Sequence, residues 1–144
     1  MIRNALIATA LVLGLTGYAT AGPDADSKQE KVVYHVNDSA VARVAMRNVQ
    51  NHITTNPDAK IVVVTHGKGI DFLLNDAKDE KGEPYQPQVA GLRDKGVEFR
   101  VCRNTLNGRK LDDKAVIMHA SVVASGVAEI GRLQSKEGYV YLKP

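Results

Sequence analysis

The sequence predicts an α/β fold, a three-layer α/β/α sandwich around a five-stranded, mainly parallel sheet. Short runs rich in β-branched residues alternate with stretches whose apolar residues recur at helical spacing. One of these runs, residues 61–64, is continuously apolar, as is typical of a central strand covered on both faces. Because strands and helices alternate along the chain, we expect parallel pairing with right-handed crossovers.

The N-terminal 21 residues have the features of a cleavable export signal. Arg3 supplies the positive charge, residues 5–15 are apolar, and Ala19-Thr20-Ala21 has the small-x-small form of a signal-peptidase site. The polar residues 22–30 are expected to form a disordered leader. The prediction is a periplasmic protein without stable membrane insertion after cleavage, whose single folded domain spans residues 31–144.

The first half of that domain predicts a β-α-β unit. Residues 31–36 are expected to form a strand, residues 37–39 a helix cap, residues 40–55 an amphipathic helix and residues 60–66 a central strand. Residues 67–74 then predict a loop with one helical turn. Residues 75–87 are polar, contain Gly82, Pro84 and Pro87, and are interpreted as an exposed insertion.

The second half predicts three further strands and three helices. A short helix over residues 88–95 is expected to lead into a strand over residues 97–102, which ends at the polar turn of residues 103–105. A helix over residues 111–119, a strand over 121–124, a helix over 126–135 and a closing strand over 139–142 follow. A chain of this size makes one domain with a core that needs no disulfides.

Composition argues against several classes of function. The 19 basic and 16 acidic residues are interleaved, giving a net charge of +3, so the chain does not resemble a nucleic-acid-binding protein. The Gly67-Lys68-Gly69 segment lacks the length and the final Lys-Ser or Lys-Thr of a phosphate-binding loop. The four histidines show no ligand spacing, so neither a metal nor a cofactor is predicted, and two of the four are interpreted as structural: His35 and His52.

Cys102 is the only cysteine, and it ends the third predicted strand. Ligands and chemistry collect at the carboxyl ends of parallel strands, so this thiol is the first candidate for a functional residue. Other polar or glycine residues that follow strands are expected at the same edge of the sheet and are pocket candidates: Asn37, His66, Gly67, Arg103, Asn104, Ser125 and Gly126.

The chemistry of the thiol leaves three interpretations open. Arg100, Arg103 and the N–H groups of the following turn could lower its pKa and make it reactive, and the imidazole of His66 could accept its proton. Alternatively, Cys102 is a small buried apolar residue, as free cysteines often are. A third interpretation is an intermolecular disulfide.

Three segments together resemble the DsrE/DsrF-like sulfur-relay family. They are residues 96–102 with the following Asn104-Thr105-Leu106, residues 123–130, and the C-terminal residues 138–144. The resemblance implies a five-stranded parallel sheet, homo-oligomers such as trimers or hexamers, and a cysteine at the end of the third strand that exchanges persulfide sulfur with donor or acceptor proteins. By position that cysteine is Cys102. The competing hypothesis is a non-catalytic module that binds a small molecule or a protein while Cys102 only packs.

Overall fold

The computed structural model describes residues 29–144. Its strands are β1 (Lys31–Asp38), β2 (Lys60–Lys68), β3 (Glu98–Cys102), β4 (Ser121–Val123) and β5 (Val140–Leu142). Its α-helices are α1 (Ala42–Thr55), α2 (Gln86–Arg93), α3 (Arg103–Gly108) and α4 (Gly126–Glu137). Single 3-10 turns span Ser39–Val41, Asp71–Leu73 and Asp113–Ala115.

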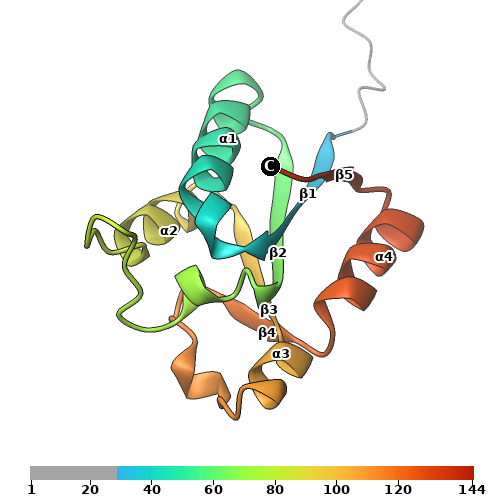
Figure 1. Cartoon of the computed structure of the whole chain (residues 1–144). Helices are drawn as coiled ribbons and strands as arrows, with labels where there is room; N and C mark the ends of the chain where they lie inside the picture. The colour runs from blue at the N-terminus through green and yellow to red at the C-terminus, as the bar shows by residue number, and fades with distance from the viewer. Residues whose placement is uncertain (1–28) are drawn as a thin grey trace, which may run out of the picture.

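The predicted α/β fold is confirmed, with one sheet of strand order β4-β3-β2-β1-β5 in which all neighbours run parallel. Helices α1 and α2 cover one face and α4 covers the other, while α3 lies at the end where β3 finishes (Figure 1). Chain order and spatial order differ because β1 lies between β2 and β5. Because all five strands run in the same direction, their carboxyl ends lie at one edge of the sheet.

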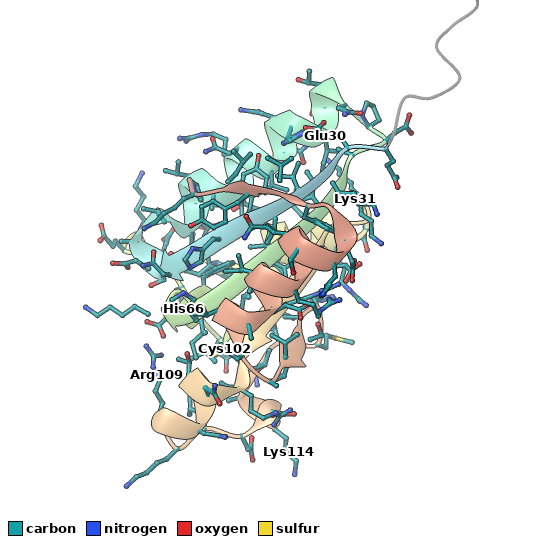
Figure 2. All side chains as sticks on the ribbon, turned by 90° about the vertical axis from the view of Figure 1, so that its right-hand side faces the viewer. Glu30, Lys31, His66, Cys102, Arg109 and Lys114 are labelled. Carbon is teal, nitrogen blue, oxygen red and sulfur yellow. The ribbon has the colours of Figure 1, made fainter. Side chains whose placement is uncertain are left out.

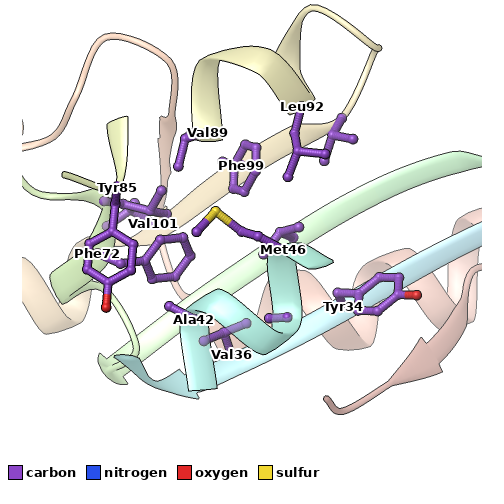
Figure 3. Packing of buried hydrophobic residues seen from close by; sticks show 14 of the residues in the cluster. Tyr34, Val36, Ala42, Met46, Phe72, Tyr85, Val89, Leu92, Phe99 and Val101 are labelled. Carbon is purple, nitrogen blue, oxygen red and sulfur yellow. The ribbon is translucent and has the colours of Figure 1, made fainter. Parts of the chain in front are cut away.

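The core is divided by the alternation of side chains along the strands. One cluster joins the α1 and α2 side of the sheet, where Met46, Phe72 and Phe99 are completely or almost completely buried (Figure 3). A smaller cluster lies on the opposite face, where Ile130 and Leu133 of α4 pack on valines of β1 and β2. On β3, Phe99 and Val101 therefore belong to the large core, whereas Cys102 faces the α4 side.

The prediction of a helix over residues 111–119 is wrong. The structure has a single 3-10 turn there, followed by extended backbone in which Val116 forms an isolated antiparallel bridge with Leu74. Val116 and Ile117 are buried, but their β-branched side chains pack as an extended segment rather than as a helical face. The third helix instead begins directly after Cys102, at the polar residues predicted to be a turn.

The segment predicted to be an exposed insertion, residues 75–87, is exposed at most of its positions but is not independent of the fold. Tyr85 is buried against Phe72, and the guanidinium of Arg43 stacks 4.4 Å from the centroid of the Tyr85 ring. The Nε of Arg43 also donates to Asp79 at 2.9 Å, and Asp79 accepts from the N–H groups of Lys81 and Glu83. The segment is thus held to α1 by polar contacts.

Within residues 29–144, no helix has both the length and the apolar character needed to cross a membrane. The expected export signal and most of the expected leader lie outside the described residues.

Candidate active site around Cys102

Cys102 lies where β3 passes into α3, beneath the first turn of α4 (Figure 2). Its side chain is buried, with 4% of the residue exposed. Burial raises the pKa of the thiol, but hydrogen bonds to the sulfur from three backbone N–H groups and one hydroxyl more than offset it. The pKa of Cys102 is therefore lowered by donors at Gly126, Thr105 and Asn104.

The hydroxyl of Thr105 is oriented by a neighbour. The N–H of Gly67, near the end of β2, donates to Thr105 Oγ1 at 3.0 Å. An oxygen that accepts this bond has its proton free to point elsewhere, and the Thr105 hydroxyl also bonds to the sulfur of Cys102. Gly67 makes this approach with a backbone φ of +58°, which a glycine adopts without strain.

Gly126 brings the start of α4 unusually close to the sheet. A Cβ on this residue would lie 3.0 Å from the carbonyl oxygen of Thr65 and 3.2 Å from the Cβ atoms of both Cys102 and His66. A residue without a side chain lets the helix approach in this way without crowding, and the approach brings the Gly126 N–H to the sulfur. Ser125 caps the helix, its hydroxyl accepting from the N–H of Ala128.

His66 lies beside Cys102 on the same face of the sheet, but its ring bonds to a neighbour on β1. Its Nε2 is 2.7 Å from Nε2 of His35, and the two rings stack with centroids 4.7 Å apart. Nδ1 of His35 is in turn 2.7 Å from the hydroxyl of Tyr141. Burial, together with His66 and Lys143, lowers the pKa of His35. Which of the two Nε2 atoms donates in this hydrogen bond depends on the tautomers of the two rings.

The structure brings four of the seven predicted pocket residues to Cys102. Gly67 acts through Thr105, Asn104 and Gly126 donate backbone N–H groups, and His66 lies alongside. Ser125 only caps α4, and Asn37 is exposed at the end of β1, two strands away from β3.

Arg103 also differs from the prediction. It points outward and forms a two-pronged ion pair with Asp113, at 2.6 and 2.7 Å. Hydrogen bonds, rather than the charge of this guanidinium, therefore account for the lowered pKa of Cys102.

Sequence reasoning missed Thr105 as an individual site residue, and it interpreted His35 as structural. A signal for Thr105 was available, because a hydroxyl three residues beyond a strand-end cysteine faces back toward it when a helix starts at that cysteine. The partners of His35 depend on strand order, which places β5 beside β1 and which the sequence does not state.

Among residues 29–144, no group of three or more histidine, cysteine or carboxylate side chains is arranged to hold a metal ion. A surface hollow of about 390 Å³ lies elsewhere, lined by residues of the 3-10 turn before α1, of α1 and of the 75–87 segment: Ala40, Arg43, Asp79, Glu80, Lys81 and Tyr85.

The profile of the DsrE/DsrF-like family matches residues 25–144. The chain belongs to the DsrE/DsrF-like family. A structure titled as a protein of unknown function, MTH1491 from Methanobacterium thermoautotrophicum, is 30% identical with a TM-score of 0.72, covering 81% of this chain and 100% of that one. The E. coli ychN protein shares the fold at 13% identity, with a TM-score of 0.66 and the same coverage. No curated protein matches this DsrE-like chain.

Proposed function

We propose that this DsrE-like protein carries sulfur on Cys102 as a persulfide and exchanges it with partner proteins. The observation that carries the proposal is the set of donors around the sulfur: the N–H groups of Gly126, Thr105 and Asn104 and the hydroxyl of Thr105. Donors of this kind stabilise a thiolate, which is the form that attacks sulfur. Membership of the family supports a sulfur-relay role of this general kind.

The exchange needs no external oxidant. The thiolate of Cys102 attacks the outer sulfur of a donor persulfide, R–S–S–H, and a new S–S bond forms as the S–S bond of the donor breaks. The donor leaves as the thiolate R–S⁻, so charge is conserved, and the outer sulfur with its proton is now on Cys102. Transfer to an acceptor thiolate repeats the same step in the opposite direction.

Burial of Cys102 places a requirement on this chemistry. A partner thiol reaches the sulfur only after α3 or the first turn of α4 moves aside, since the residue is 4% exposed. The six residues of α3 bury one side chain, Leu106, so this helix is weakly anchored. The same burial favours the competing function, a binding module in which Cys102 only packs, and the experiment below separates the two.

We also propose that the mature protein is periplasmic and forms homo-oligomers. The export proposal is supported by the arrangement of residues 1–21. The assembly proposal is supported by apolar side chains left open to solvent on α4 and the edge strand β5, including Val127 at 64%, Val140 at 60% and Leu142 at 40% exposure.

The proposal is tested by the pH dependence of alkylation of Cys102 with iodoacetamide. The midpoint reports the pKa of the thiol, and we expect it below the value of about 8.5 for a free cysteine. Thr105→Val keeps the shape of the side chain but removes the hydroxyl donor, so its midpoint should rise. The matched control Thr55→Val removes an exposed hydroxyl near the end of α1 and should leave it unchanged.

Loading is then measured by intact mass after incubation with a persulfide donor. The wild-type protein should gain the mass of one sulfur atom, and Cys102→Ser should not. A wild-type midpoint at or above that of a free cysteine, or no added sulfur, would show that the thiol is structural.

A further inference from the structure

The first turn of α4 is fixed to the sheet by an ion pair that the sulfur chemistry does not itself require. Arg100 lies on β3 two residues before Cys102, so both side chains face α4. One arm of its guanidinium contacts Glu129 of α4, and the other donates to Glu98 at 2.5 Å. Glu129 also accepts from Arg132 of its own helix, from Nε at 3.0 Å and from Nη2 at 2.8 Å, but that contact does not reach the sheet. The side chains of Arg100 and Glu129 are 15% and 12% exposed, which makes this a largely desolvated pair.

Apolar packing alone does not fix that end of the helix. Val127 follows Gly126 directly and is 64% exposed, whereas Ile130 and Leu133, further along α4, pack in the core. Glu129 lies between the two regions, and its N–H bonds to the carbonyl of Ser125 at 2.9 Å. A contact that fixes Glu129 therefore also fixes the helical turn that includes Gly126.

We propose that Glu129, held by Arg100, is a positioning residue that keeps the first turn of α4, and with it the Gly126 N–H, against the sulfur of Cys102. The inference rests on the proposed function, because it assigns how one donor of the thiolate is kept in place. It adds two residues, one on β3 and one on α4, that do not touch the sulfur.

The sign of one substitution separates positioning from direct electrostatics. Glu129→Gln removes the negative charge that neutralises Arg100 and Arg132, so electrostatics alone would stabilise the thiolate and increase reactivity at low pH. Positioning predicts the reverse, because a loosened first turn takes the Gly126 N–H away from the sulfur. Loss of one hydrogen bond to an anion corresponds to about a tenfold loss of thiolate at a pH below the midpoint.

The experiment compares alkylation profiles of the wild-type protein, Glu129→Gln and Glu98→Gln. Glu98→Gln is the control: it makes the same chemical change in the other carboxylate that contacts Arg100, and it leaves the contact between Arg100 and α4 intact. We expect Glu129→Gln to shift the midpoint upward, to slow alkylation about tenfold below it, and to raise the plateau rate at high pH because the sulfur becomes more accessible. Glu98→Gln should show none of these three changes.

Arg100→Lys provides a second variant in case Glu129→Gln does not fold. It keeps the positive charge but cannot contact both carboxylates in the same geometry, so positioning predicts an upward midpoint and electrostatics predicts none. A midpoint that falls or stays constant in folded Glu129→Gln, or stays constant in Arg100→Lys, overturns the inference. That result is distinct from failure of the proposed function, which shows in the wild-type midpoint.

Discussion

Substitution of Gly126 by alanine tests the close approach on which the candidate site depends. The added methyl group would lie 3.0 Å from the carbonyl oxygen of Thr65 and 3.2 Å from the Cβ atoms of Cys102 and His66. Ordinary contacts between such atoms are a few tenths of an ångström longer, and the atoms it meets belong to the backbone or stand directly on it. The start of α4 must therefore move away from the sheet.

The magnitude follows from two opposing effects. Overpacking of this kind costs about 1 to 3 kcal/mol, whereas replacing glycine by alanine in a helix returns at most about 1 kcal/mol. We expect Gly126→Ala to lower the free energy of unfolding by about 1 to 2 kcal/mol. Gly131→Ala in the same helix is the matched control, because nothing lies within 4 Å of its added methyl group, and it should stabilise by about 0.5 to 1 kcal/mol.

Urea denaturation of the two variants measures the difference, and iodoacetamide kinetics follow the thiol. The midpoints in urea should differ by about 1 M, with Gly126→Ala lower. The alkylation midpoint of Gly126→Ala should also move to higher pH, because the N–H that bonds to Cys102 moves with the helix. The reasoning is refuted if Gly126→Ala is as stable as Gly131→Ala and titrates like the wild-type protein.

Two further predictions concern other parts of the sheet. Gly69→Ala places a Cβ 2.1 Å from the carbonyl oxygen of Val36, so it should lower the free energy of unfolding by more than about 3 kcal/mol or prevent folding. Gly91→Ala, in open space on α2, is the control and should not destabilise the protein. Thermal melts measure the difference, and equal melting temperatures for the two variants would contradict this prediction. The pKa of His35 is lowered by burial, by His66 and by Lys143, so the unfolded chain binds that proton more readily. Stability should thus be full above about pH 6.5 and decline as the pH falls below it, and urea titrations should show a smaller decline in His35→Gln, an unchanged decline counting against the assignment.

The sheet could be predicted because its strands carry their own signal. The β-branched run of β2 and the capped amphipathic pattern of α1 are local, and the structure agrees with them to within a few residues. The helix α3 could not be predicted in this way, because its six residues hold one buried apolar side chain, Leu106, and no periodic pattern. The helix predicted over residues 111–119 is the opposite case: a helix was expected where none forms. Val116 and Ile117 are adjacent and both buried, and such a pair fits a helix as well as an extended segment.

The sequence predicts which edge of the sheet holds the candidate site, but not how the residues at that edge are arranged around Cys102. Parallel pairing alone places Gly67 and Cys102, near the ends of β2 and β3, at the same edge of the sheet as Gly126, which follows β4. The role of Gly126 as a close contact depends on how near α4 approaches, which is a tertiary distance that composition does not encode. The prediction for Arg103 failed for a related reason, because its partner Asp113 lies in a segment whose conformation was itself mispredicted.

Among the donors around Cys102, Asn104 and Thr105 are near it in sequence, but Gly126 belongs to α4 and the Thr105 hydroxyl is oriented by Gly67 of β2, so the set is complete only when β2, β3, α3 and α4 are assembled. In the unfolded chain the thiol therefore has an ordinary acidity. Thermodynamic linkage then makes ionisation of the sulfur and assembly of the sheet mutually reinforcing: the thiolate contributes stability at pH values above the unfolded pKa, and that contribution disappears as the pH falls through the folded one. Removing the negative charge from the sulfur, as alkylation or a neutral mixed disulfide does, gives up this contribution. The ionisation state of one sulfur atom is thus coupled to the integrity of the whole domain.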